Sequence, residues 1–123
     1  MPAQPLTVED PAMQMTLYGL KNCDTCKKAL KALDDAGHSV DFIDIRAEAD
    51  LGVSVPTWLA AAGKETLVNR RSTTWRNLDN ATRDRDPAAL LVDHPTLIKR
   101  PVIETQDQVY VGWAKDVQAA LLD

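Results

Sequence analysis

The sequence predicts an α/β fold in which one mixed β-sheet carries helices on both sides. Three observations predict it. The first part of the chain, from Met15 to Ile45, has the pattern of a strand, a helix and a strand. The last part, from Val102 to Leu122, has the pattern of two short strands and a helix. The segment between them is helical and irregular, so we expect a helical insertion between a βαβ part and a ββα part.

The length and composition of the chain fit one domain. It has 123 residues, 45% of them hydrophobic, so a core can form without disulfide staples. We expect a single domain over residues 15–123, preceded by a flexible tail over residues 1–14, which carry three prolines. The formal net charge of -4 argues against direct nucleic-acid binding, because phosphate binding needs a basic face.

The expected location of the protein is the cytoplasm. No stretch approaches the roughly 20 apolar residues that cross a bilayer, so no membrane partner is expected. Residues 1–13 lack the basic start and the apolar run of a signal peptide. Cysteines in the cytoplasm stay reduced unless they do redox work. Cys23 and Cys26 are therefore not expected to form a structural staple.

The first predicted unit is a parallel βαβ unit. Residues 15–18 form a short β-prone run that Gly19 ends. Residues 40–45 form the second strand. Between them a helix ends near Gly37, because its apolar residues recur at helical spacing: Ala29, Leu30, Leu33 and Ala36. Two strands joined by one such helix are parallel, with a right-handed crossover.

The middle of the chain predicts a series of helices. One helix begins with Ser54 as its cap and Pro56 in its first turn, and Gly63 ends it. The rest of this segment is predicted as a polar, basic loop over residues 69–74 and short helices over residues 75–81 and 87–92.

The last part of the chain predicts a hairpin and a helix. The strands of the hairpin cover residues 102–105 and 109–111, joined by residues 106–108. The final helix covers about residues 113–122, and its inner face carries Val117, Ala120 and Leu121. The order βαβ, helices, ββα indicates a thioredoxin-like sheet with a helical insertion.

Cys23 is the candidate nucleophile, because it falls where the first strand gives way to the first helix. Backbone N–H groups at the start of a helix are unpaired and carry partial positive charge. A thiolate there is stabilised, so we expect a pKa below the value of about 8.5 that is usual for cysteine. Lys21, Lys27 and Lys28 add positive charge nearby.

Cys26, one helical turn further on, has two interpretations. At that spacing its thiol can attack a mixed disulfide on Cys23 and release the partner. Alternatively, it is a small apolar core residue on the inner face of the helix. A zinc site would need a second pair of ligands, and the only histidines, His38 and His94, are not at ligand spacing. No metal is therefore expected.

Two basic segments are candidates for holding negative charge. The loop from Asn69 to Trp75 can bind an oxyanion or a carboxylate, or it is simply a solvated surface loop. The segment Lys99-Arg100-Pro101 precedes a strand. In a thioredoxin-like sheet a proline at that place is often cis and packs beside the cysteine segment, which would bring Arg100 near Cys23. The alternative is an ordinary proline at the start of a strand, with a surface arginine before it.

Three segments together carry a family resemblance. They are residues 17–29 (Leu-Tyr-Gly-Leu-Lys-Asn-Cys-Asp-Thr-Cys-Lys-Lys-Ala), residues 73–79 (Thr-Thr-Trp-Arg-Asn-Leu-Asp) and residues 94–102 (His-Pro-Thr-Leu-Ile-Lys-Arg-Pro-Val). In these segments the chain resembles the arsenate reductase-like (ArsC/Spx) family, and the YffB-like branch most closely. The resemblance covers about residues 15–122 in the same order.

The resemblance implies a role for each matching residue. Cys23 takes the place of the family's nucleophilic cysteine. Arg100 matches an arginine that helps to bind the oxyanion in the arsenate reductases, and Pro101 matches the cis proline after it. Arg71 matches a basic loop residue of the YffB-like and Spx branches. The expected catalytic residues are thus Cys23, Cys26 and Arg100, and the expected substrate-binding residues are Lys21, Asn22, Arg71, Arg100 and Pro101.

The chain also departs from the arsenate reductases, which carry three arginines around the anion. The first arginine falls nearer Asn69 here, although Arg70 or Arg71 could replace it, and no arginine stands near Gly112-Trp113 for the third. The usual arsenate reductase also lacks a cysteine at the place of Cys26. These departures put arsenate itself in doubt as the substrate.

The resemblance predicts a thiol-dependent reductase without a bound cofactor. Its substrate would be a disulfide, a glutathione adduct or an oxyanion, with glutathione as a co-substrate and glutaredoxin or thioredoxin as a partner. The alternative is a redox-switched regulator of the Spx type. In that case a disulfide between Cys23 and Cys26 would be the switch, and RNA polymerase would be the partner.

Overall fold

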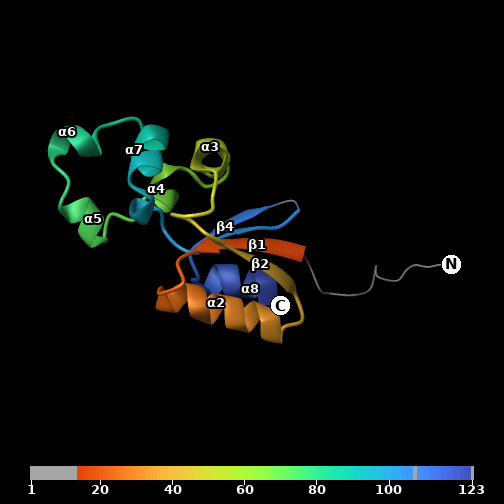
Figure 1. Ribbon diagram of the computed structural model, residues 1–123. Coiled ribbons are helices and arrows are strands. Elements are labelled where there is room, and N and C mark those ends of the chain that lie inside the picture. Colours follow the sequence, from red (N-terminus) through yellow and green to blue (C-terminus); the bar gives the residue numbers. More distant parts are fainter. Residues whose placement is uncertain (1–13, 107, 123) are drawn as a thin grey trace.

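The computed structural model describes residues 14–106 and 108–122. Within these residues four strands form one mixed sheet in the order β2-β1-β3-β4 (Figure 1). Strand β1 is parallel to β2, whereas β3 is antiparallel to both β1 and β4. The strands are β1 (Gln14–Gly19), β2 (Ser39–Asp44), β3 (Val102–Glu104) and β4 (Val109–Val111). The predicted mixed sheet is confirmed, including the parallel βαβ unit and the hairpin.

The helices follow the predicted order, with most of them between β2 and β3. Residues 45–101 are called the helical insertion from here on. The helices are α2 (Asp24–Asp35), α3 (Leu51–Ala62), α4 (Lys64–Leu67), α5 (Thr73–Arg76), α6 (Asn80–Arg83), α7 (Pro87–Asp93), the 3-10 turn η1 (Pro95–Leu97) and α8 (Lys115–Leu122). The predicted tail lies outside the described residues, except for Gln14, which is the first residue of β1.

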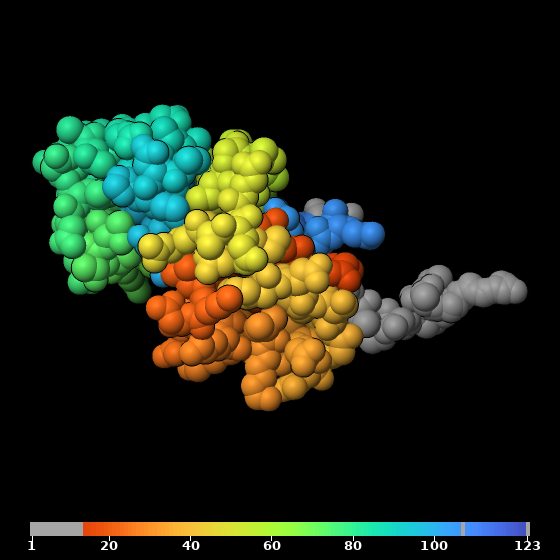
Figure 2. All heavy atoms as spheres, in the orientation of Figure 1, coloured from red at the N-terminus to blue at the C-terminus, as the bar shows by residue number. Residues whose placement is uncertain are grey.

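Each face of the sheet is covered by its own core. Helices α2 and α8 lie together under one face, where Leu17 and Ile103 are buried against Leu33 and Val117 (Figure 1). On the other face, Val102 is buried against the helical insertion. Figure 2 shows the insertion, yellow to cyan, projecting to one side of the orange α2 layer. The prediction of helices on both sides is confirmed.

The predicted start of the first insertion helix is wrong by four residues, because the cap residue is Asp50 and not Ser54. Helix α3 begins at Leu51 after Asp50, so Ser54 and Pro56 lie inside it. Leu51, Val55 and Trp58 are all buried and share one helical face, and their burial outweighs the hydrogen bond that a proline removes. The end at Gly63 is confirmed by its positive φ of 83°.

The predicted helix over residues 75–81 is two single turns instead. Ser72 Oγ accepts a hydrogen bond from the Trp75 N–H at 3.1 Å and caps α5. Asp79 Oδ1 accepts one from the Thr82 N–H at 2.8 Å and caps α6. Each cap starts a new helix, which breaks the single helix that the pattern predicts. Helix α4 was not predicted at all.

Two small predictions about inner faces are also wrong. In α8, Val117 and Leu121 are buried as predicted, but Ala120 is exposed. Ala36 does not extend the inner face of α2, because the helix ends before it and Ala36 is the exposed C-cap residue. Among the helices of the described chain, none is long and apolar enough to span a membrane.

Candidate functional site

Cys23 occupies the N-cap position of α2. The chain leaves β1 at Gly19 and makes a turn, in which the Cys23 N–H donates to the Leu20 carbonyl at 3.1 Å. The Cys23 carbonyl then accepts the Lys27 N–H at 3.0 Å, which begins the helix. The side chain is partly exposed. The predicted position at the junction of strand and helix is therefore confirmed.

Cys26 lies under Cys23 in the core between α2 and the sheet. Its side chain is 1% exposed and belongs to the same buried cluster as Leu17 and Leu33. The sulfur packs against the backbone of Gly19, where an added Cβ would lie 2.5 Å from Sγ. The close approach of strand and helix at this point thus depends on a glycine. Of the two interpretations of Cys26, the position in the core is the one observed, next to Cys23.

The two thiols have opposite pKa shifts. Partial burial works to raise the pKa of Cys23, but hydrogen bonds from the Cys26 N–H and thiol and from Arg100, together with the charge of Arg100, outweigh it. The pKa of Cys23 is therefore below its ordinary value. Burial, by contrast, raises the pKa of Cys26 to about 11. Near neutral pH, Cys23 is the thiol that ionises more readily, and the thiolate is the nucleophilic form.

Arg100 is the cation that acts on the Cys23 sulfur. Its Nη1 donates to the Thr96 carbonyl at 3.1 Å, which anchors the guanidinium from the end of the insertion. Its Nε is buried and has no hydrogen-bond partner among the described residues. A buried N–H group without a partner is costly. The predicted proximity of Arg100 to Cys23 is confirmed.

The peptide bond between Arg100 and Pro101 is cis, as the sequence predicts. Pro101 is buried, and its carbonyl accepts the Gly112 N–H at 2.8 Å, which ties this segment to the end of β4. This hydrogen bond fixes the point at which the chain passes from the insertion into β3. Arg100 is therefore held by two hydrogen bonds, its own to the Thr96 carbonyl and the one that the next residue, Pro101, accepts from the Gly112 N–H.

Lys21 and Asn22 immediately precede Cys23 in the turn after β1. Both are exposed, and they line an open hollow of about 400 Å³ together with Leu20, Asp44 and Arg46. The hollow adjoins the turn that precedes Cys23 and is wide enough for a small ligand. A role of these two residues in substrate binding stays a prediction.

Arg71 lies apart from this group. It is exposed in the loop between α4 and α5, where its N–H donates to Asn69 Oδ1 at 3.1 Å. It lines a hollow of about 430 Å³ with Arg70 and Lys99. In the part of the chain that the structure describes, no hydrogen bond or ion pair joins its side chain to either cysteine. Its role in substrate binding is also still a prediction.

Two functional neighbours were missed by the sequence reasoning. Gly19 was read only as the end of a strand, although it makes room for Cys26. Nothing in the sequence pattern assigns a role to Thr96, although its carbonyl anchors Arg100. A glycine in a strand can indicate close packing against a helix residue, so Gly19 could have been found from the sequence. A backbone carbonyl such as that of Thr96 is present at every residue, so the sequence does not indicate its role. The described residues hold no group of three or more His, Cys, Asp or Glu that could bind a metal ion.

The class of protein that this fold and site define is a thioredoxin-like domain with a helical insertion. It carries two neighbouring thiols and a cis proline. Its residues 18–121 match the family model described as the ArsC family, so the chain belongs to the ArsC family. Structures of this family have the same fold, as the solved YFFB protein shows: it has a TM-score of 0.79 and 38% identity and covers 89% of this chain and 99% of its own.

Further relatives lie in more than one branch of the family. An uncharacterized protein of Haemophilus influenzae is 43% identical over 112 residues, which cover 86% of this chain and 97% of that protein. The solved structure of an arsenate reductase (ArsC) related protein from Brucella melitensis has a TM-score of 0.69 and 34% identity and covers 87% of this chain and 93% of its own. The global transcriptional regulator Spx of Streptococcus pyogenes is 28% identical over 116 residues, covering 88% of this chain and 84% of that protein.

Proposed function

We propose that this protein is a thiol-dependent reductase of the cytoplasm in which Cys23 is the nucleophile. The observation that carries the proposal is the lowered pKa of a partly exposed thiol beside the guanidinium of Arg100. A thiol that ionises near neutral pH and can be reached by solvent is the reactive kind. The unpartnered Arg100 Nε supports a substrate with negative charge close to the reacting sulfur.

The reaction begins when the Cys23 thiolate attacks one sulfur of a substrate disulfide or glutathione adduct. A bond forms between Cys23 and that sulfur, the substrate disulfide breaks, and the other half leaves as a thiolate that takes up a proton. Arg100 stabilises the negative charge that moves between the sulfurs. The product at this stage is a mixed disulfide on Cys23.

A second thiol completes the reduction. It attacks the Cys23 sulfur of the mixed disulfide, releases the bound half as a thiolate that takes up a proton, and is itself left joined to Cys23. A further molecule of the same thiol then attacks the sulfur of that bound thiol, so Cys23 leaves as a thiolate and the disulfide of the reductant forms. Two electrons thus pass from the two thiols to the substrate. Cys26 is adjacent, but its buried thiol has a pKa raised to about 11 and stays protonated near neutral pH. We therefore assign this step to an external thiol such as glutathione, whose own disulfide is the oxidised product.

The experiment is a reductase assay with glutathione as reductant, run on a protein disulfide, a glutathionylated peptide and arsenate. Wild-type protein is expected to turn over at least one of the two disulfide substrates. Cys23→Ser should abolish turnover, because a hydroxyl is not ionised at neutral pH. Cys26→Ser should retain most of it. Unchanged activity in Cys23→Ser would end the proposal.

A second candidate is a redox-switched regulator that binds RNA polymerase. Two observations favour it: the similarity to Spx, and the position of Cys26 directly beneath Cys23. Its test is capture of polymerase subunits by the full chain with and without oxidant, using Cys26→Ser as the variant that cannot form the disulfide. Polymerase that is retained by wild type in one redox state only would favour the regulator. Absence of polymerase under both conditions would reject it.

A further inference from the structure

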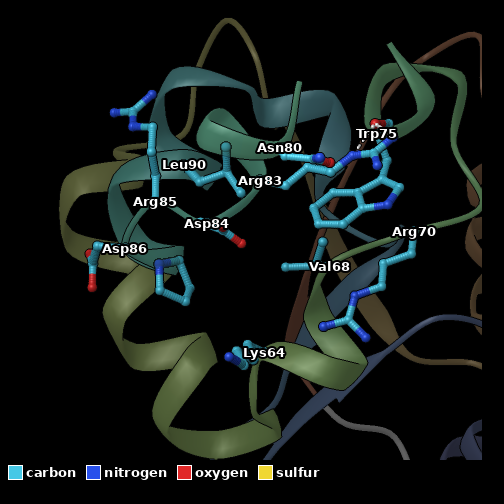
Figure 3. A pocket seen from close by; sticks show the side chains of 11 residues that line it. Lys64, Val68, Arg70, Trp75, Asn80, Arg83, Asp84, Arg85, Asp86 and Leu90 are labelled. Carbon is cyan, nitrogen blue, oxygen red and sulfur yellow. Dashed lines mark hydrogen bonds between the residues drawn. The ribbon is translucent and has the colours of Figure 1, made fainter. Parts of the chain in front are cut away.

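A further hollow, larger than the two described above, lies within the helical insertion. It measures about 570 Å³ and is lined by α4, the loop after it, α5, α6, the α6–α7 connection and α7 (Figure 3). Pockets of about 300–1,000 Å³ hold small molecules. None of the residues assigned to the thiol chemistry lines it. It therefore needs an explanation of its own.

Two cations on its wall lack close partners. Lys64 forms no ion pair among the described residues. Arg70 has one, with Glu65, at 4.0 Å between side chains that are 51% and 70% exposed, and its guanidinium also lies 5.8 Å from the centre of the Trp75 ring. An exposed pair at that distance contributes little, so both cations are available to a ligand. The pair Lys64 and Arg70 favours an anionic group, and phosphate is one that both residue types bind well.

A flat aromatic wall stands between these cations and α6. The Arg83 side chain donates to the Trp75 carbonyl from Nε at 3.2 Å and from Nη2 at 3.0 Å. Its guanidinium lies 5.1 Å from the centre of the Trp75 ring, which fixes the indole in place. The apolar side chains of Val68 and Leu90 line the hollow beside it (Figure 3). An inorganic anion would leave this apolar surface uncovered, so the ligand needs an apolar or aromatic part as well as an anionic group.

Two polar side chains without positive charge, Asn80 and Asp84, line the hollow at α6 and directly after it. The Asp84 carboxylate points into the hollow, and Asn80 lies near Trp75 and Arg83 (Figure 3). In the described part of the chain, the Asp84 side chain accepts no hydrogen bond and forms no ion pair. A carboxylate at this place repels a second anion but accepts hydrogen bonds from hydroxyl or amino groups. The ligand therefore has an anionic end and a donor-bearing end.

We propose that this hollow binds a nucleoside monophosphate. Lys64 and Arg70 hold the phosphate, Asp84 and Asn80 accept the hydroxyl or amino hydrogens, and the base packs against the apolar side chains of Val68 and Leu90 beside Trp75. Each part of such a ligand meets a part of the wall with matching chemistry. The site is separate from Cys23 and does not depend on the reductase proposal.

The experiment is titration calorimetry on the full chain with three probes: adenosine monophosphate, adenosine and inorganic phosphate. Adenosine monophosphate is expected to bind at least about tenfold more tightly than either of the others, a difference of about 1.4 kcal/mol. No heat of binding at millimolar concentration of the monophosphate would overturn the proposal. Equal binding of adenosine or of phosphate alone would overturn it too.

Variants locate the site. Lys64→Ala combined with Arg70→Ala, and separately Asp84→Asn, are expected to weaken the monophosphate by at least about tenfold. Arg46→Ala is the matched control, because Arg46 is an exposed cation on another hollow. Equal loss in Arg46→Ala would indicate a general charge effect and overturn the site. Cys23→Ser should bind normally, which separates this proposal from the reductase. Unchanged melting temperatures would establish that the variants fold.

Discussion

The layer that contains α2 and the helical insertion are built in different ways. In the α2 layer, one 12-residue helix and long backbone ladders hold Cys23 and Cys26. In the insertion, one helix of the same length, α3, is followed by α4, α5 and α6 with four residues each, and side-chain caps begin α5 and α6. The buried contacts that join the insertion to the sheet include Trp58, whose Nε1 donates to Glu104 Oε2 at 2.7 Å.

This difference teaches which part of the site tolerates change. The sulfur of Cys23 comes from the α2 layer, whereas Arg100 comes from the last residues of the insertion. The pKa of the thiol thus depends on the alignment of two parts with separate cores. Changes within either core should alter stability, whereas changes at their junction, or of Cys26 itself, should also alter the pKa of the Cys23 thiol.

Trp58→Ala should give the largest effect, in the core of the insertion. The side chain is fully buried and stacks edge-on against Tyr18 with ring centres 4.8 Å apart. Removing it should cost about 3–5 kcal/mol of unfolding free energy, measured by urea denaturation. Trp58→Phe keeps most of the volume and loses the hydrogen bond to Glu104, at a cost of about 1–3 kcal/mol. Equal losses in the two variants would contradict the packing argument.

Gly19→Ala should give the next largest effect, in the α2 layer. The new Cβ would lie 2.5 Å from the Cys26 Sγ, so the sulfur or the helix must move. Overpacking of this kind costs about 1–3 kcal/mol, again measured by urea denaturation. The same change in a Cys26→Ala background removes the closest atom and should be milder. A cost that is the same in both backgrounds would mean that the sulfur is not the obstacle.

Ser72→Ala tests the insertion's dependence on caps. Loss of the hydrogen bond to the Trp75 N–H should cost about 1 kcal/mol. Thr73→Ala, at the next and exposed position, is the control and should stay within about 0.5 kcal/mol of wild type. Both values come from thermal or urea unfolding. If the two variants lose equal stability, the side-chain cap is not what begins α5.

Arg100→Met should leave stability least affected and change the thiol most clearly. Because the guanidinium lowers the pKa of Cys23, its loss should move the midpoint of the alkylation rate against pH to a higher pH. The thiolate fraction at neutral pH should fall accordingly. Lys21→Met is the control: the sequence predicts a charge contribution from Lys21, but the groups that shift the pKa of Cys23 are Cys26 and Arg100, so its midpoint should equal that of wild type. An unmoved midpoint in Arg100→Met would remove Arg100 from the site.

The thiol at position 23 also makes stability depend on pH in a definite direction. Its pKa is lower in the folded chain, so the stability it contributes is present above the unfolded pKa and is lost as the pH falls through the folded pKa. Cys26 acts in the opposite sense, because its pKa is raised: its contribution is lost as the pH rises toward about 11.

The regular elements of this protein could be predicted from its sequence, and the local ones could not. The periods of β1, α2 and the hairpin are strong, and the position of Cys23 followed from them. The sequence pattern places the start of α3 too late, because Ser54 and Pro56 favour a helix start there, whereas the buried residue Leu51 already belongs to the helix. The single turns α5 and α6 depend on hydrogen bonds of Ser72 and Asp79, which no apolar periodicity reveals.

The candidate site divides in the same way. The nearness of Arg100 to Cys23 followed from the proline after it and from family resemblance, and the structure confirms it. The anchoring carbonyl of Thr96 and the space at Gly19 depend on tertiary contacts, so sequence alone did not indicate them. The hollow around Trp75 is assembled from several short helices and was likewise not foreseen.

The part of the insertion from residue 70 to residue 96 is closed at its base by two backbone hydrogen bonds. The Lys99 N–H donates to the Leu67 carbonyl at 2.8 Å, and the Asn69 N–H donates to the Leu97 carbonyl at 2.7 Å. These bonds join the two ends of residues 70–96 like a neck. Doubling the length of a loop whose ends are already joined costs only about 0.6 kcal/mol. Evolution can therefore lengthen, shorten or exchange this segment while Arg100, just beyond the neck, keeps its place, so new specificities can be grafted here onto an unchanged frame.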